Sequence, residues 1–549
     1  MANALIYRQF KTYFRPRKLV AFLGLIAIIL LIALGNLYAT HIYGDRFHSF
    51  PPGLNHDPAL GWQEVYNGMV KVCLYLQVIV CIYGALAVSA ECIGGERSRN
   101  THDLLVTLPL SPWQKLWGLL IGHNLYCYLG FVILCPLGLA FAFMAGYAVL
   151  KMLVLYGLLL ACMACFGLMG LAISSSLNGL LAILVAFGVF LAGLGIMSAT
   201  ERDRNQADWS LDCPLLPFAP FGVLGRGLDE AAGDATRLAH RGRWDREYYS
   251  SRDEQNPTVS FFNQTMPWQL GVLTWYAYLG VLSALVAAAK LSRPSLPPLR
   301  RPVTLLFFVL AITGLLGFWW QGMLGEYPSE NLSSSFVGFT YAWTIGFFLL
   351  TFVWSLLTAP SYPQLLMWAR YRPGRSNSLL RLFSDTFHRM APNLVFTALL
   401  WIIACASLYG FGRWHGVELE NRMALFLLAC LLGLLVQANL LFMLGEAFWK
   451  RMGKFGGLVI TFALCAGPLL IGLGQTKESP SPYSPLSAMW YLGDITPGGS
   501  HFGLAPLADD AGGMWTMLAA SWAPVIVFLV IFCLWCDYQA RREISAAKP

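Results

Sequence analysis

A short charged segment between two long apolar runs carries the residues best suited to recognition chemistry. It extends from Glu96 to Ser111 and combines charged side chains with leucines at Leu104, Leu105 and Leu108. In a helix those leucines lie on one face, and a compact apolar face of this kind fills a groove in a partner protein. The surrounding charges would form a polar rim that sets orientation more than affinity. The segment therefore indicates binding to a soluble partner.

Many residues of this segment fit a recognisable sequence pattern. Counted from Glu96, the sequence fits the pattern E-R-x-x-G-T-x-x-L-L-x-T-x-P-L-S, with Asn100 at the glycine position and Asp103 where Glu is usual. Asparagine can replace that glycine because it also accepts left-handed backbone angles. The order resembles the cytoplasmic coupling segment of type-2 ABC exporter permeases. The matching residues are Glu96, Arg97, Thr101, Leu104, Leu105, Thr107, Pro109, Leu110 and Ser111.

The resemblance implies a partner that supplies the energy for transport. In such permeases the coupling segment contacts ABC ATPase subunits that bind ATP and Mg²⁺, so we expect two copies of that subunit here, with room for accessory subunits. The chain has no G-x-x-x-x-G-K-[ST] phosphate-binding loop, so the ATPase would be a separate polypeptide. We expect coupling to the ATPase through Glu96, Arg97, Arg99, Thr101, Asp103, Leu104, Leu105, Leu108 and Pro109.

The residues that flank the segment predict how it is held. Gly94 and Gly95 are expected to break the preceding span, so that a new helix can run along the membrane surface. Ser111 and Gln114, with Pro112 between them, form a capping-box pattern that starts the next helix. A surface helix that packs on its own transmembrane bundle would show leucines at the same spacing, and this alternative stays open.

The composition predicts an all-α integral membrane protein. Hydrophobic residues make up 57% of the 549 residues and charged residues only 12%, about half the share in soluble domains. Twelve apolar runs are long enough to span a bilayer, and we expect the third to tilt or kink near Pro136. The runs are 19–38, 70–90, 116–145, 152–173, 179–197, 270–289, 303–321, 336–358, 394–412, 423–444, 457–474 and 515–536.

The positive charges predict the topology. If both termini are cytoplasmic, the inner segments hold 23 Lys and Arg residues, and the outer segments hold 6 outside the long loop 198–269. Long loops cross a membrane regardless of charge, so the comparison leaves loop 198–269 out. The bias then favours a multi-pass protein of the cytoplasmic (inner) membrane, with both termini on the cytoplasmic side. Loop 198–269 itself has 11 acidic residues against 8 arginines, and we expect it to be a solvated outer cap.

The spans fall into two parallel six-span halves with similar loop lengths. Internal symmetry is common in transporters, and the resemblance implies a fused tandem, although agreement in loop lengths can also arise by chance. The second half lacks the coupling motif, so loop 359–393 is either a second contact or a basic anchor. The predicted parts are an interfacial amphipathic helix (1–18), a first unit (19–289) with coupling segment 91–115 and outer loop 198–269, a linker (290–302), a second, degenerate unit (303–536) and a cytoplasmic tail (537–549).

Other functions find less support in the sequence. An integral-membrane enzyme would need a convergent acid–base or metal set in the outer loop, and its titratable residues are scattered. A non-transporting subunit of a membrane complex remains a second alternative. Polar side chains within the predicted spans are few, and those that could line a cavity are Gln77, His123, Asn124, Gln437, Asn439 and Glu446. We expect a lipid membrane as the surroundings, no nucleic-acid partner, and no catalytic, metal or cofactor site in the chain itself.

Overall fold

The structure is a computed structural model that describes a set of helices in the first three-fifths of the chain. The described residues are 16–47, 58–98, 107–176, most of 182–193, 219–232, 258–292 apart from 262 and 263, 301–324 and a few isolated positions beyond. The chain divides into two compact units, Met1–Pro298 with Leu315–Gly322, and Leu299–Gly314 with Met323–Pro549. The prediction of two matching six-span halves stays a prediction, because most of the second unit lies outside the described residues.

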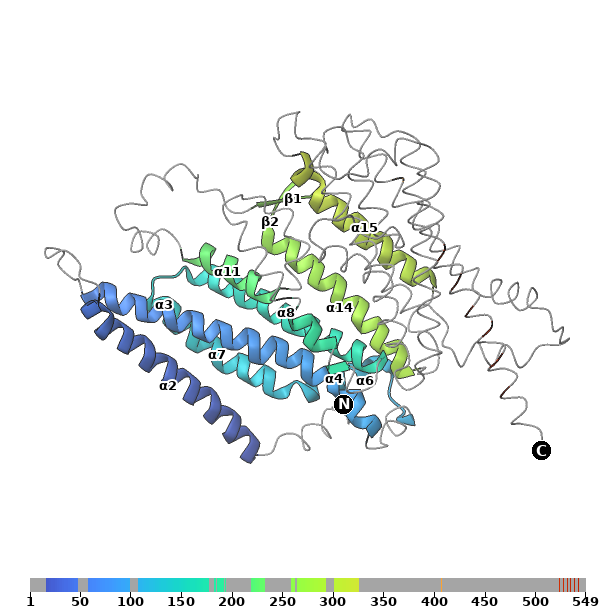
Figure 1. The fold of residues 1–549 in the computed structure, drawn as a ribbon, viewed down its shortest axis with the longest axis horizontal. Helices are drawn as coiled ribbons and strands as arrows, with labels where there is room; N and C mark the ends of the chain where they lie inside the picture. The colour runs from blue at the N-terminus through green and yellow to red at the C-terminus, as the bar shows by residue number, and fades with distance from the viewer. Residues whose placement is uncertain are drawn as a thin grey trace. The chain divides into compact units, whose positions relative to one another are not determined.

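The described elements are almost all helices (Figure 1). A single helical rod is formed by α3, the π-helix η1 and α4, which follow one another without a break. A small antiparallel pair of strands, β1 (Thr258–Phe261) and β2 (Gln264–Pro267), precedes α14. The helices are α2 (Pro16–Phe47), α3 (Pro58–Leu76), η1 (Gln77–Tyr83), α4 (Gly84–Ser98), α6 (Pro112–His123), α7 (Leu125–Met144), α8 (Val149–Ser176), α11 (Pro220–Ala231), α14 (Trp268–Ser292) and α15 (Arg301–Leu324).

Five of these helices are long and apolar enough to cross a membrane, which confirms a multi-pass protein. Each overlaps a predicted run, and α15 covers the predicted run 303–321. The finer prediction of twelve spans falls largely on residues outside the described ones, as does the interfacial helix 1–18 apart from its last residues, which belong to α2. The five membrane-crossing segments are Leu19–Ala39, Val65–Glu96, Leu125–Met144, Val149–Ser176 and Trp268–Ser292.

The predicted span 116–145 is divided, but at a different residue from the one expected. The helix stops at Asn124, which has φ −87° and ψ 14°, and α7 then runs through Pro136. The Asn124 side chain donates from Nδ2 to the Ser89 hydroxyl of α4 over 2.8 Å. A buried side-chain hydrogen bond to a neighbouring helix holds the interruption, whereas a proline within an apolar span is tolerated by local adjustment.

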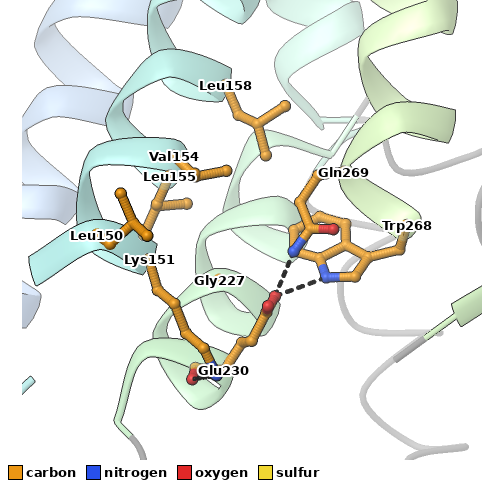
Figure 2. Close-up of a pocket in the computed structure, with 9 residues that line it drawn as sticks. All are labelled: Leu150, Lys151, Val154, Leu155, Leu158, Gly227, Glu230, Trp268 and Gln269. Carbon is orange, nitrogen blue, oxygen red and sulfur yellow. Dashed lines mark hydrogen bonds between the residues drawn. The ribbon is translucent and has the colours of Figure 1, made fainter. Parts of the chain in front are cut away.

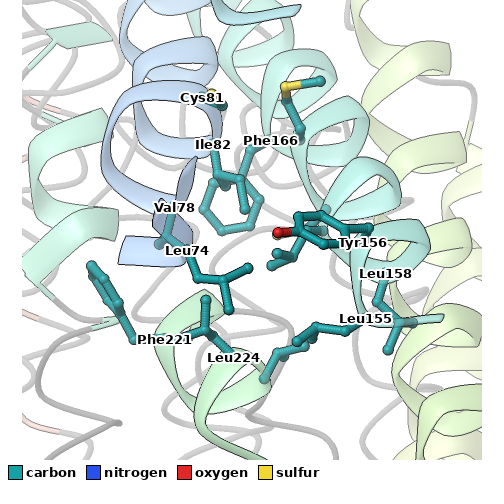
Figure 3. Packing of buried hydrophobic residues seen from close by; sticks show 14 of the residues in the cluster. Leu74, Val78, Cys81, Ile82, Leu155, Tyr156, Leu158, Phe166, Phe221 and Leu224 are labelled. Carbon is teal, nitrogen blue, oxygen red and sulfur yellow. The ribbon is translucent and has the colours of Figure 1, made fainter. Parts of the chain in front are cut away.

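The core of the first unit lies where the α3–η1–α4 rod meets α8. Figure 3 shows Leu74, Val78 and Ile82 of the rod packing toward Tyr156 and Phe166 of α8. Helices α4 and α8 approach closely because Gly170 of α8 faces the backbone of α4 at Leu86 and Ala90. Small residues permit such close packing between membrane helices, where there is no hydrophobic driving force between the helices themselves.

Part of the outer loop is buried in this core, which corrects the expectation of a solvated cap for residues 219–232. Helix α11 inserts the side chains of Phe221 and Leu224 among residues of η1 and α8 (Figure 3), and its Val223 is fully buried in the same cluster. Its apolar residues lie on one face of a short helix, so the helix can bury that face while its other face stays polar. Composition alone did not reveal this, since the loop as a whole is rich in charge.

Candidate functional site

The predicted coupling segment begins at the end of α4, and its first part differs from expectation. Helix α4 continues through Gly94 and Gly95 to Ser98, so the predicted break at these glycines is wrong. The Ser174 hydroxyl of α8 accepts hydrogen bonds from the backbone N–H groups of Ile93 at 3.0 Å and Gly94 at 3.3 Å. A glycine costs a helix only about 1 kcal/mol, and this contact with α8 holds the last turns of α4 in place.

Glu96 is buried at this end of α4, with 7% of its surface exposed. We expected it at an exposed polar rim, and its burial makes it part of the anchor of the segment instead. The Arg97 backbone lies in α4, while its side chain lies outside the described residues. Arg99, Thr101, Asp103, Leu104 and Leu105 also lie outside the described residues, so their contact with an ATPase stays a prediction.

Leu108 packs against the protein's own helices. It is half-buried, and together with Leu110 it contacts a cluster that joins α4, α6, α8 and α14. This matches the alternative in which leucines of the segment face the bundle, although only for Leu108. Pro109 beside it is exposed. Leu108 therefore supports the segment from inside the protein, and a contact of Leu104 and Leu105 with a partner stays a prediction.

The capping box that follows the segment is confirmed. Ser111 donates its backbone N–H to the Gln114 side-chain oxygen over 3.0 Å, and Gln114 donates its backbone N–H to the Ser111 hydroxyl over 3.2 Å. Pro112 occupies the first turn, where its missing N–H has no cost. Lys115 follows directly, and its burial lowers the pKa of the ammonium group. Helix α6 thus starts at a fixed point next to the segment.

Three of the predicted membrane-embedded polar residues are buried in the structure. Gln77 is fully buried in η1, and neither its side-chain nitrogen nor its oxygen has a hydrogen-bond partner among the described residues. Asn124 bonds Ser89, as described above. His123 is buried at the end of α6, whereas Gln437, Asn439 and Glu446 lie outside the described residues.

Three tyrosines that were not among the predicted polar residues share the bundle interior. The hydroxyl oxygens of Tyr83, Tyr156 and Tyr276 are buried and have no hydrogen-bond partner in the described part of the chain. Aromatic residues in membrane proteins are enriched in belts at the two membrane–water interfaces, whereas these three tyrosines are buried in the bundle. No local sequence pattern marks them, because their burial depends on the packing of η1, α8 and α14 against one another.

A pocket of about 120 Å³ lies near the beginning of α8, at the opposite end of that helix from Ser174 (Figure 2). Residues of α8 from Leu150 to Leu158 form one wall, and α11 and α14 form the others. The Glu230 carboxylate of α11 accepts hydrogen bonds from the Trp268 indole at 2.9 Å and from the Gln269 side-chain amide. This carboxylate joins α11 to α14.

The pocket gives little support to an enzyme site in the outer loop. Its carboxylate serves as a hydrogen-bond acceptor for two neighbours, and Lys151 donates to the Glu230 backbone carbonyl oxygen over 3.1 Å. In the part of the chain that the structure describes, no three His, Cys, Asp or Glu side chains are placed to hold a metal ion. The described cysteines, which include Cys162 and Cys165, are unpaired thiols.

No protein-family model matches the chain, and neither a curated protein nor a solved structure matches it. Any functional conclusion therefore rests on the segment Glu96–Ser111 and on the helices that hold it.

Proposed function

We propose that this chain is the membrane-spanning permease subunit of an ABC exporter, with ATP hydrolysed by separate ATPase subunits. The observation that carries the proposal is the sequence of residues 96–111, placed between a membrane-crossing helix and a capping box. In this proposal the segment is cytoplasmic, as the excess of positive charge in the inner loops favours, and so are both termini.

The local structure supports a mechanical role for the segment. Both of its ends are held in place. At the α4 end, the backbone of Ile93 bonds the Ser174 hydroxyl of α8, and at the α6 end the capping box fixes the start of the helix. Leu108 and Leu110 rest on a cluster that joins four helices. A force applied between these ends would pass into α4 and α6 together, since the α4 end is held by the buried Ser174 hydroxyl and the α6 end by the capping box and the contacts of Leu108 and Leu110. Packed side chains and hydrogen bonds of this kind can carry coupling between distant sites.

A pair of double variants tests the proposal. Leu104→Asp with Leu105→Asp would place unpaired charge in an apolar groove, which costs about 3–5 kcal/mol of association. We expect loss of co-purification with the ATPase and loss of ATP-driven export, with normal membrane insertion. The matched control is Leu379→Asp with Leu380→Asp in the second half, which lacks the motif and should be affected less.

A third variant separates a contact with the partner from a contact inside the protein. Leu108→Asp should lower the thermal stability of the purified chain, because Leu108 packs on its own bundle. The Leu104/Leu105 variant should melt like the wild type. Export at the wild-type level by the Leu104/Leu105 variant, or a stronger defect in the second-half control, would contradict the proposal.

ATP turnover distinguishes the proposed function from the alternatives. The purified chain alone should show only background ATP hydrolysis. The rate of hydrolysis should rise when the ATPase subunit is added. An integral-membrane enzyme or a non-transporting subunit would not require that partner for activity. Native co-purification that never yields an ATPase would favour those alternatives.

A further inference from the structure

We propose that the pocket between α8, α11 and α14 binds a phospholipid with a primary ammonium headgroup, such as phosphatidylethanolamine. The proposal rests on the membrane setting of the helices and is independent of the ABC assignment. It would give the chain a lipid site held by Lys151 and Glu230, with an acyl chain along Leu150, Val154 and Leu158 (Figure 2).

The shape and lining of the pocket fit an acyl chain. Aliphatic side chains of α8 cover most of the wall, and the volume of about 120 Å³ is close to that of engineered apolar cavities that accept a benzene-sized group. The side chains of Leu150 and Val154 are 76% and 46% exposed. Because α8 crosses the membrane, these exposed side chains face lipid, and a chain from that lipid can enter the pocket directly.

The charges at the rim fit a headgroup that carries both signs. Lys151 makes one hydrogen bond, to the Glu230 carbonyl oxygen, and among the described residues it forms no ion pair. An ammonium group has three donors, so two remain for a phosphate. Lys151 also lies in the first turn of α8, where the helix dipole adds to the attraction for an anion.

Glu230 supplies the opposite charge. One of its oxygens, Oε2, accepts from Trp268 and Gln269, and these two bonds hold the carboxylate toward the pocket (Figure 2). The other oxygen is left to accept a hydrogen bond from a ligand. A primary ammonium can donate that bond, whereas the quaternary ammonium of phosphatidylcholine cannot. A headgroup with negative charge alone would meet repulsion from the carboxylate.

Helix α11 is held firmly enough to form such a site. The Ala148 backbone N–H donates to the Ala231 carbonyl oxygen over 2.9 Å. A Cβ added at Gly227 would lie 2.4 Å from a Leu155 methyl carbon, so the two helices are in close contact there. These contacts fix the distance between Lys151 and Glu230, so the rim is preorganised for a ligand.

Photo-crosslinking tests the proposal. The purified full-length chain is placed in phosphatidylcholine nanodiscs that contain phosphatidylethanolamine with a diazirine in its acyl chain. After illumination, labelled peptides are mapped by mass spectrometry. We expect labelling of the first turns of α8, more strongly than with the matching phosphatidylglycerol or phosphatidylcholine probe. Equal labelling by the three probes would overturn the headgroup assignment.

Variants assign the roles of the two charges. Lys151→Gln should lower labelling about five-fold, the equivalent of about 1 kcal/mol for one cation near a lipid phosphate. Lys71→Gln removes another exposed lysine and should change nothing. Glu230→Gln keeps an oxygen acceptor for Trp268 and Gln269 but removes the charge, so it should abolish the preference for phosphatidylethanolamine over phosphatidylglycerol.

A filled pocket provides the remaining control. Val154→Phe should block labelling, while Leu153→Phe, at a neighbouring exposed position that does not line the pocket, should not. Displacement of the lipid probe by excess inorganic phosphate would show a site for free phosphate and contradict the proposal. Equal labelling of wild type and Val154→Phe would place the lipid elsewhere on the protein.

Discussion

Replacing Gly170 with alanine should separate α4 from α8. A Cβ at this position would lie 2.5 Å from the Leu86 carbonyl oxygen and 3.1 Å from the Ala90 backbone nitrogen. Ordinary contacts begin at 3.4 Å, so the helices must move apart by about 1 Å. A flexible side chain could turn aside, but backbone atoms of a helix cannot.

The expected cost follows from the position of this contact. Overpacking costs about 1–3 kcal/mol, and the separation would also stretch the nearby Asn124–Ser89 hydrogen bond and those of Ser174. We therefore expect a loss of stability near 3 kcal/mol. Thermal unfolding in detergent can be followed with a thiol-reactive dye, since most of the described cysteines are buried.

Gly157 of the same helix is the matched control. A Cβ there would meet nothing within 4 Å, so Gly157→Ala should stabilise α8 by about 0.5–1 kcal/mol through its better helix propensity. The two alanine variants should therefore shift the midpoint in opposite directions. If Gly170→Ala melts at or above the wild-type temperature, the close contact between α4 and α8 is not present in the protein.

Three further changes test other contacts. Ser111→Ala removes the capping box and should cost about 0.5–2 kcal/mol in the same melting assay, while Ser111→Asp should restore most of it; equal stability of the two would contradict the role of the cap. Ser174→Ala removes the acceptor for Ile93 and Gly94, and it should speed amide hydrogen exchange at those two residues, whereas unchanged exchange would contradict the role of the hydroxyl. Phe221→Ala should cost about 3 kcal/mol and expose α11 to limited proteolysis, and an unchanged cleavage pattern would show that α11 is not docked.

Two local features of this chain could be predicted from its sequence, and the structure confirms both. The run predicted at 152–173 is α8, Val149–Ser176, because twenty or more consecutive apolar residues have few alternatives to a membrane helix. The capping box at Ser111 could also be predicted, since it depends on residues three positions apart.

Features that depend on distant residues could not be predicted. The interruption at Asn124 is held by a hydrogen bond to Ser89, thirty-five residues away in the sequence, and no local pattern predicts that bond. Gly94 and Gly95 suggested a helix end by propensity, but tertiary contacts of α4 with α8 outweigh a penalty of about 1 kcal/mol each. The burial of Glu96 likewise follows from neighbouring helices, and charge alone suggested exposure.

The π-helix at Gln77–Tyr83 determines where the second membrane span can change length. Its hydrogen bonds, such as that from the Gly84 N–H to the Ile79 carbonyl oxygen, enclose one residue more than those of an α-helix. Deleting one residue inside η1 would convert the turn to ordinary α-helix and leave Val70 and Ala90, which are both fully buried, facing their present neighbours. A deletion between Val70 and Ala90 but outside η1 would instead rotate one of them out of the core by about 100°. Evolutionary relatives that lack the π-turn should therefore align with this chain through a one-residue gap at 77–83, and with no gap in the helices on either side.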